Sequence, residues 1–195
     1  MRLCFKLCGL ILYVGIALIQ LGCSVPAFAN LNYPYTGRAE NQMRDDSELS
    51  VKIETEIKER YLKSSVAIKV VADHYNVLLL GQVDSQDTKN SLSQLIKNEP
   101  SVKQYWDYTT ISTAPMLHEN AAVNKKALLR IKDEDNITLD SLQTATVDNV
   151  VYILGNIQAE EIDNMDSAIT GINAIAGVVK VVNLTQVATY ATPSI

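Results

Sequence analysis

A short sequence pattern occurs twice in this chain. Residues 77–83 read VLLLGQV and residues 151–157 read VYILGNI. The offset that joins Gly81 to Gly155 also aligns apolar residues with apolar residues in other parts of the chain. The aligned pairs include Leu49 with Val123, Ile53 with Ala127, Ile57 with Ile131, and Ile68 with Leu142. Because the repeat is longer than a solenoid unit and two copies cannot form an array, the duplication predicts two small domains of one fold in tandem.

The two copies predict the same order of elements, helix–strand–strand–helix–strand. In the first copy, Leu49, Ile53 and Ile57 recur every four residues, which predicts a helix with Asp45 or Asp46 as its N-cap. The other elements predicted there are strands around 66–70 and over 77–83, a helix over 85–98 and a strand over 102–111. The second copy predicts helices over 121–132 and 160–174, and strands near 138–146, over 150–157 and over 178–187. The apolar residues of the second of these helices are Ile162, Met165, Ile169 and Ile172. The fold class is therefore α+β, and each domain is a small three-stranded sheet with two helices on one face.

These elements place the first domain at residues 47–112, a connection at 113–119 and the second domain at 120–187. Residues 188–195 show no pattern and are predicted as a tail. Strands of the second copy are apolar on both sides, so we expect the two helix-free sheet faces to pack on each other. The alternative is that the free face forms a groove for a ligand or a membrane. A domain of about 70 residues buries only a modest part of its surface, which favours such a shared interface.

Gly81 and Gly155 lie inside predicted strands, where glycine normally weakens the pairing. Their presence at the same place in both copies predicts either a β-bulge or a helix backbone packed closely against the strand. The sequence has no glycine-rich phosphate-binding loop, so both glycines are interpreted as structural.

The first 29 residues are predicted to be a signal peptide, because two basic residues open the segment, an apolar run follows and small residues end it. Cleavage after Ala29 would leave a soluble mature protein. Residues 21–23 also resemble the end of a bacterial lipobox. In that case the signal is residues 1–22 and Cys23 becomes a lipidated first residue. The sequence leaves both processing sites open.

Residues 30–46 show neither a helical nor a strand period and are predicted as a linker. All three cysteines lie within the first 23 residues, so the folded part cannot contain an intramolecular disulfide or a thiolate metal site. The net charge is −5. An acidic chain repels phosphate backbones, which argues against a nucleic-acid partner.

No catalytic constellation emerges from the sequence. The two histidines are His74, in a predicted hairpin turn, and His118, in the connection, and neither belongs to a pattern typical of a nucleophile or a metal site. Residues 133–136 read DEDN but lack the glycine and the alternating oxygen ligands of an EF-hand loop. We therefore predict a non-enzymatic protein without a metal or cofactor, and we interpret His74 as a solvated turn residue.

Two units of this element order, each with an L-x-G-x-V motif or its close variant around Gly81 and Gly155, resemble BON domains. The resemblance covers about residues 47–187 and includes a G-V-x-x-V-x-N segment that begins at Gly177. The first copy departs from this segment, because Ser101 and Asp107 replace the glycine and the asparagine.

A tandem pair of BON-like domains behind an export signal is similar to OsmY-like periplasmic proteins and DolP-like outer-membrane lipoproteins of Gram-negative bacteria. The resemblance implies a periplasmic protein whose domains bind phospholipid surfaces. It also implies a role in maintaining the envelope under osmotic or membrane stress.

The helix predicted over 121–132 is the part of the sequence that best suggests a partner, because it carries four cations and no acid. These cations are Lys125, Lys126, Arg130 and Lys132. Each cation near a membrane surface attracts anionic headgroups by about 1 kcal/mol, so anionic phospholipid is the predicted partner. The other interpretation of these cations is a solvated basic face on an acidic protein. The alternative is a protein-interaction module that recruits or regulates an envelope enzyme through its free sheet faces.

Overall fold

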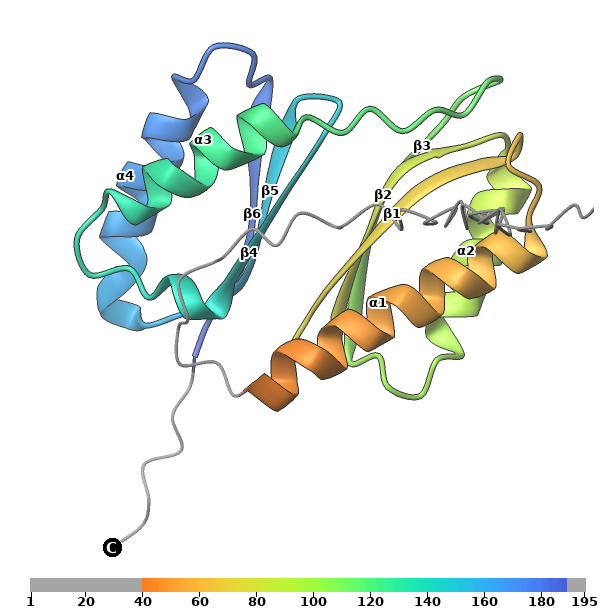
Figure 1. Cartoon of the computed structure of the whole chain (residues 1–195), viewed down its shortest axis with the longest axis horizontal. Helices are drawn as coiled ribbons and strands as arrows, with labels where there is room; N and C mark the ends of the chain where they lie inside the picture. Colours follow the sequence, from red (N-terminus) through yellow and green to blue (C-terminus); the bar gives the residue numbers. More distant parts are fainter. Residues whose placement is uncertain (1–39, 189–195) are drawn as a thin grey trace, which may run out of the picture. The chain divides into compact units, whose positions relative to one another are not determined.

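The computed structural model describes residues 40–188, which contain two three-stranded sheets, each with two α-helices (Figure 1). The first repeat consists of α1 (Glu40–Arg60), β1 (Val66–Asp73), β2 (Asn76–Val83), α2 (Gln86–Lys97) and β3 (Gln104–Ile111). The second consists of α3 (Ala121–Lys132), η1 (Leu139–Ser141), β4 (Leu142–Val147), β5 (Val150–Ile157), η2 (Ala159–Glu161), α4 (Ile162–Asn173) and β6 (Lys180–Val187). The predicted α+β class and the tandem arrangement are confirmed. The predicted signal peptide, Cys23 and most of the tail lie outside the described residues.

In each sheet the middle strand is antiparallel to one neighbouring strand and parallel to the other. The strand orders are β1-β2-β3 and β4-β5-β6. The first pair in each sheet is an antiparallel hairpin and the second pair is parallel. Parallel neighbours need a long crossover, which α2 and α4 provide. Figure 1 shows the helices of each repeat on one face of their own sheet, so the opposite face of each sheet carries no helix.

Two-residue turns join the strands of both hairpins. His74 and Tyr75 have φ angles of 51° and 64°, and Asp148 and Asn149 have 49° and 61°. Left-handed conformation at both central positions is type I′ geometry, which Asp and Asn tolerate far better than Tyr. The first turn has additional support, because the buried carboxylate of Asp46 accepts hydrogen bonds from the backbone N–H groups of His74 and Tyr75, each at 2.9 Å.

This role of Asp46 corrects the prediction for the first helix. The helix begins at Glu40, so neither Asp45 nor Asp46 is its N-cap and the predicted linker does not extend to residue 46. Residues 40–44 include Glu, Gln, Met and Arg, which favour the helix. Asp46 in the second turn points instead at the hairpin and also accepts from the side-chain amide of Gln42 at 3.2 Å.

The two motif glycines have a different cause from the predicted one. The β1–β2 register runs through Gly81 and the β5–β6 register runs through Gly155 without an inserted residue, so neither marks a bulge. Their φ angles are 112° and 133°, and an added Cβ would lie 2.0 Å from the Ala67 carbonyl oxygen and 1.8 Å from that of Ser141. The crowding backbone belongs to β1 at Gly81 and to the last residue of the short 3-10 turn η1 at Gly155, and in neither case to an α-helix.

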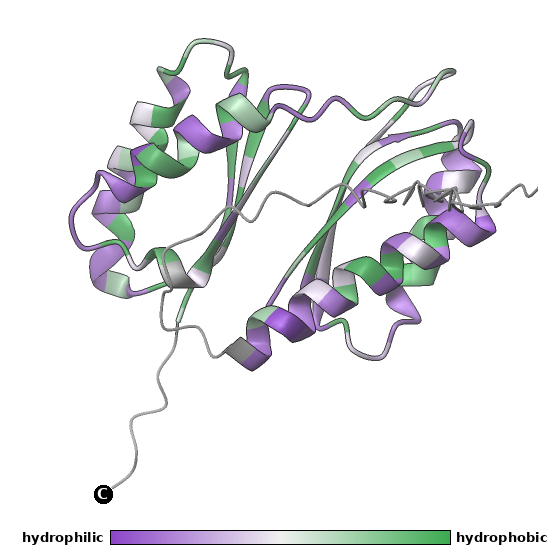
Figure 2. Ribbon diagram, viewed as in Figure 1, coloured by the Kyte–Doolittle hydropathy of each residue, from purple (hydrophilic) through white to green (hydrophobic). Residues whose placement is uncertain are grey.

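A hydrophobic core lies between the helices and the sheet of each repeat, and the apolar strand residues are visible in Figure 2. In α1 the predicted stripe is buried, with Leu49, Ile53 and Ile57 at most 5 % exposed. In α4 the prediction was partly wrong, because Ile162 is 39 % exposed and Ala168 takes the buried position. Ile162 follows the short turn η2, so the helical period starts later than the sequence suggested.

A third apolar cluster contains residues from both sheets. Its buried members are Val71, Leu78 and Leu80 of the first repeat and Ala145, Val147, Tyr152 and Leu154 of the second. The rings of Tyr108 and Tyr152 meet edge to face, with centroids 5.2 Å apart. The Gln143 side-chain amide also donates to the Ala72 carbonyl at 2.9 Å. The expectation that the helix-free faces pack on each other is confirmed.

Candidate functional site

The helix α3 is oriented by its cap and its buried stripe. The Asn120 side-chain oxygen accepts a hydrogen bond from the Val123 N–H at 3.0 Å, which satisfies a free amide at the helix start. Val123, Ala127 and Ile131 recur every four residues and are at most 5 % exposed. Because one side of the helix is fixed against the core, the opposite side faces solvent.

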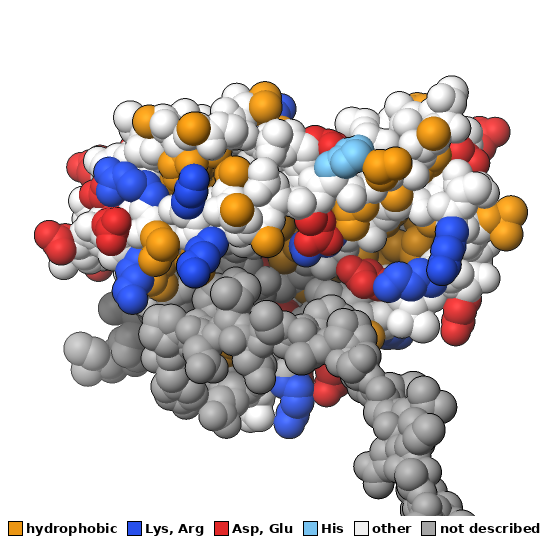
Figure 3. All heavy atoms as spheres, turned by 45° about the horizontal axis from the view of Figure 1, so that its top comes forward, with side chains coloured by type: hydrophobic (Ala, Val, Ile, Leu, Met, Phe, Trp, Pro, Cys, Tyr) orange, Lys and Arg blue, Asp and Glu red, His pale blue; other side chains and the backbone are white. Residues whose placement is uncertain are grey.

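The solvent side of α3 presents three lysines around a leucine. Lys125, Lys126 and Lys132 are exposed, and Leu129, one helical turn after Lys125, is 47 % exposed. No ion pair joins these lysines to an acid among the described residues. We call these four residues the α3 surface. In Figure 3 cationic and hydrophobic side chains both gather on the half that holds the second repeat.

Arg130, the fourth predicted cation, lies elsewhere on the helix. Its guanidinium is 2.6 Å from the Glu134 carboxylate. It also covers Gly171 of α4, where an added Cβ would lie 2.0 Å from the arginine Nε. The structure therefore places Arg130 at the contact between α3 and α4 and not among the free lysines.

The corresponding helix of the first repeat has its cations paired. Lys52 lies 2.6 Å from the carboxylate of Glu99, which is 7 % exposed, and Lys58 lies 3.1 Å from Glu54. The hydrogen bond from Lys52 lowers the pKa of the Glu99 carboxyl, although burial opposes this effect. Because its cations are neutralised by acids on or near the same helix, α1 offers no free cationic face comparable to that of α3.

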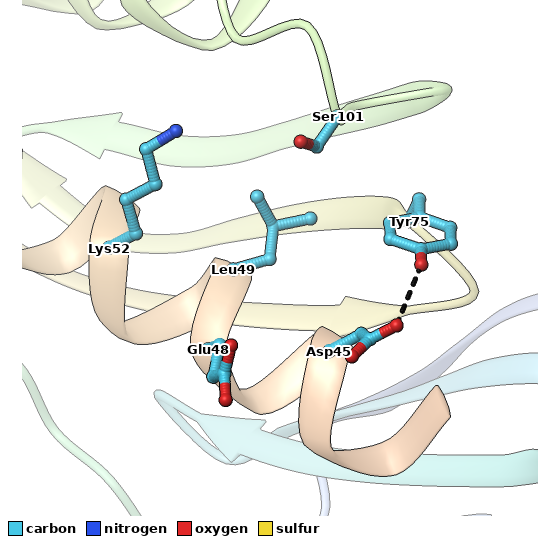
Figure 4. Close-up of a pocket in the computed structure, with 6 residues that line it drawn as sticks. All are labelled: Asp45, Glu48, Leu49, Lys52, Tyr75 and Ser101. Atoms are coloured by element: carbon cyan, nitrogen blue, oxygen red, sulfur yellow. Dashed lines mark hydrogen bonds between the residues drawn. The ribbon is translucent and has the colours of Figure 1, made fainter. Parts of the chain in front are cut away.

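A hollow of about 380 Å³ lies beside the start of α1 (Figure 4). Its lining residues are Asp45, Glu48, Leu49, Lys52, Tyr75 and Ser101. The Tyr75 hydroxyl donates to Asp45 at 3.0 Å, and this bond raises the pKa of the Tyr75 phenol. Lys103 lies 4.9 Å from the centre of the Tyr75 ring. The charged groups of this hollow thus already have partners within the first repeat.

Three potential metal ligands, Asp46, Asp73 and His74, lie within 4.8 Å of one another. The oxygens of Asp46 accept from two turn amides, and the His74 Nδ1 lies 2.9 Å from the buried carboxylate of Asp73. The sequence suggested a freely solvated His74. In the structure its ring is held at the turn by Asp73. The cluster is explained by the geometry of the hairpin and does not require an ion.

The acidic loop after α3 is held by a buried carboxylate. Glu161 is 3 % exposed and accepts from the Thr138 N–H at 2.7 Å, the Thr138 hydroxyl at 2.6 Å and the Gln158 N–H at 2.6 Å. Burial alone would raise the pKa of the Glu161 carboxyl, but these hydrogen bonds outweigh it and lower the pKa. From the sequence, Glu160 and Glu161 are typical of a helix N-terminus, and that pattern does not reveal this bridge.

Within residues 40–188, no helix has the length and apolar character needed to span a bilayer.

The BON domain family model matches residues 45–107, which include α1, the hairpin, α2 and the start of β3. The first repeat is a BON domain. The second repeat has the same order of elements and the same strand topology as this BON domain. The motif residues have matching structural roles in both repeats, since Asp107 and Asn183 each accept from the backbone N–H of the threonine two residues later, at 2.9 and 3.0 Å.

The chain is also similar to the outer membrane lipoprotein DolP of Haemophilus influenzae. The two are 27 % identical over 146 residues, which cover 70 % of this chain and 74 % of the relative. A match of this length is longer than one BON domain, so it reaches both repeats. The first repeat thus matches the BON domain family, and the chain as a whole is similar to a protein named as an outer membrane lipoprotein.

Two solved structures of CdsD, a structural protein of the type III secretion system of Chlamydia trachomatis, align with TM-scores of 0.31 and 0.32 at 12 % and 11 % identity. The alignments cover 75 % and 74 % of this chain. They cover 64 % and 67 % of the CdsD chains, so the chain spans less than two thirds of the first. Scores this low support no conclusion about function or domain arrangement.

Proposed function

We propose that this protein is a non-enzymatic periplasmic protein that binds anionic phospholipid surfaces through α3. Its physiological role in this proposal is to support outer-membrane integrity or resistance to osmotic and envelope stress. The observation that carries the proposal is the α3 surface, where Lys125, Lys126 and Lys132 lack a described acidic partner and surround the exposed Leu129.

The charge distribution favours this surface over the rest of the molecule. Each lysine near an anionic membrane contributes about 1 kcal/mol of attraction. The chain as a whole carries −5, so other faces are repelled and the protein is oriented with α3 toward the membrane. Leu129 adds an apolar contact at the centre of the cations, as in interfacial amphipathic helices.

An anchor at Cys23 would strengthen this binding. The DolP relative is named as a lipoprotein, which supports the lipobox interpretation of residues 21–23 over cleavage after Ala29. One lipid-binding signal usually gives weak, reversible attachment, whereas an anchor and a cationic surface together give stable attachment. In this proposal a lipid on Cys23 attaches the chain to the outer membrane and α3 binds the anionic headgroups.

Co-flotation of residues 30–195 with lipid vesicles tests the headgroup contact. We expect flotation with vesicles that contain phosphatidylglycerol, no flotation with phosphatidylcholine alone, and weaker flotation at high salt. The double variant Lys125→Glu/Lys126→Glu should lose binding. The matched control Lys63→Glu/Lys97→Glu reverses two exposed lysines of the first repeat and should keep most of it. Equal losses in the two double variants, or no binding by the wild type, would overturn the proposal.

The outer edge of β1 supports the alternative function, a protein-interaction module. From the sequence alone, the free sheet faces were the surface expected to bind a partner protein. In the structure these faces are covered by the third apolar cluster. In a hairpin closed by a two-residue turn, the backbone groups of Val66, Ile68, Val70 and Ala72 point away from β2. Glu54 accepts from the Val70 N–H at 3.2 Å and Gln143 donates to the Ala72 carbonyl, which seals one half of this edge.

A hollow of about 310 Å³ lies along the other half of the edge. It is lined by Glu54, Ile57, Lys58, Lys63, Val66, Ala67, Ile68 and Leu117. An extended segment of an envelope protein would pair with this edge and fill the hollow. A photo-reactive residue at position 63 should then form adducts in intact cells, while one at the exposed position 97 should not. Identical adduct patterns from both positions would rule this function out.

A further inference from the structure

The turn between α4 and β6 presents a valine to solvent. Val179 is 71 % exposed, and the exposed residues Ala176 and Gly177 precede it. Residues 174–182 read AIAGVVKVV and contain no acid. The exposed Lys180 follows directly after the valine. This turn therefore presents an apolar side chain directly beside a cation.

This turn is fixed to the start of α3. The Val179 N–H donates to the Asn149 carbonyl at 2.9 Å. The Asn149 side chain in turn accepts at 2.8 Å from the side-chain amide of Asn120, the residue that caps α3. Gly177, with φ of 93°, brings its backbone close enough that an added Cβ would lie 3.7 Å from Val123 of α3. The valine is therefore held at a defined place beside the helix start and does not sit on a loose loop.

The start of α3 itself presents no bulky apolar side chain to solvent, because Val123 is buried. Its exposed residues are Ala121 and Ala122, which extend little beyond the backbone. Val179, bonded to the same hairpin turn as the cap, therefore supplies the larger apolar group at this corner. Two exposed acids lie near this corner in the chain, Asp148 of the turn and Glu119 before the cap. Glu119 pairs with Lys69 at 2.7 Å, and the cations along the surface are Lys125, Lys126 and Lys180.

We propose that Val179 is the apolar insertion element of the α3 surface. While the lysines contact the headgroups of an anionic bilayer, the valine enters the boundary between headgroups and acyl chains. Amphipathic membrane-binding elements combine cations and apolar side chains in this way, because burial of the apolar group adds to the electrostatic attraction. This inference rests on the proposed function, since it names a further contact of the same lipid-binding surface.

A fluorescent label can test the insertion directly, because the chain after residue 23 has no native cysteine. Val179→Cys in residues 30–195 is labelled with the environment-sensitive dye NBD and mixed with phosphatidylglycerol vesicles. We expect a blue shift, a rise in intensity, and quenching by nitroxides placed on the acyl chains. The matched control is Val51→Cys on α1, which is 60 % exposed and aligns with Lys125 in the duplication. Its label should stay in water.

Substitutions at the same position give a second readout. Val179→Asn should weaken vesicle affinity about tenfold, because the polar amide cannot enter the acyl boundary, and Val179→Leu should keep or increase it. Thermal unfolding should be unchanged, as the side chain is exposed. Flotation of the wild type together with an unresponsive label at 179 would overturn the insertion and leave the proposed function standing. Failure of the wild type to float would overturn both.

Discussion

The two repeats share a topology but differ at the first helix and at the corner where that helix meets the hairpin turn. In the first repeat α1 has 21 residues, its cations are paired, and a carboxylate within the helix holds the turn. In the second, α3 has 12 residues, begins at the corner with Asn120 as its cap, and leaves three lysines free of described acids. The comparison shows that a duplicated core can be kept while its surface changes role.

Residues that align in the two copies account for this difference. Asp46 aligns with Asn120 and Tyr75 with Asn149. In the first repeat Asp46 bonds to the turn backbone, and Tyr75 lines a hollow closed by charged partners. In the second the two asparagine side chains bond to each other, which leaves the turn before β6 close to the helix. The first corner thus holds its own hairpin turn, whereas the second holds the turn before β6 beside the helix.

The shared glycine gives the largest expected effect, because both repeats depend on the same close backbone approach. Gly155→Ala places a Cβ 1.8 Å from the Ser141 carbonyl oxygen at a φ of 133°. We expect a loss of about 3–5 kcal/mol in the free energy of unfolding, measured by chemical denaturation. The control Gly171→Ala meets only the flexible Arg130 side chain and should change stability by less than about 1 kcal/mol. A similar loss in both variants would contradict this account.

The corner of the first repeat gives the next largest effect. Asp46→Ala leaves the His74 and Tyr75 amides without the acceptor that holds the type I′ turn. Each unsatisfied buried donor costs about 1–3 kcal/mol, so we expect a loss of about 2–4 kcal/mol in the free energy of unfolding. Asp46→Asn keeps one oxygen acceptor and should lose less. If the denaturation midpoint of Asp46→Ala equals that of the wild type, the turn does not need the Asp46 carboxylate.

The smallest expected effect is on stability at acid pH. It compares the acidic residues at the starts of the two second helices, Glu161 before α4 and Asp87 in α2. Because the folded-state pKa of Glu161 is lowered, ionised Glu161 stabilises the fold above its ordinary value of 4.5, and this contribution disappears as the pH falls through the folded pKa. We expect Glu161→Gln to be less stable than the wild type at neutral pH, by about 1–2 kcal/mol, and this difference to shrink below pH 4.5.

The control for acid stability is Asp87→Asn, which changes the exposed residue that aligns with Glu161 in the first repeat. This variant should follow the wild type in denaturation midpoints measured between about pH 6 and 3. A constant difference between Glu161→Gln and the wild type across that range would show that the hydrogen bonds do not depend on ionisation.

The duplicated pattern, the order of elements and the fold class could all be read from the sequence. They are local properties, because the period of apolar residues reports which face of a helix or strand is buried. The same logic located α3 and its lysines, since the 12 consecutive residues 121–132 contain cations and no acid. Local patterns were least reliable at element ends, where Asp46 resembled a cap and Ile162 resembled a core residue.

Tertiary structure alone decided which charges and apolar groups are free. Lys52 is neutralised by Glu99 and Arg130 is held over Gly171, contacts that join separate elements and leave no periodic signal in the chain. Val179 became part of the candidate surface only because Asn149 and Asn120 hold its turn beside α3. The sequence by itself determined two copies of one α+β fold. It also predicted that their helix-free faces pack on each other. Only the folded chain determined which residues form that shared core and which lysines have no acidic partner among the described residues, because pairing depends on distances in space.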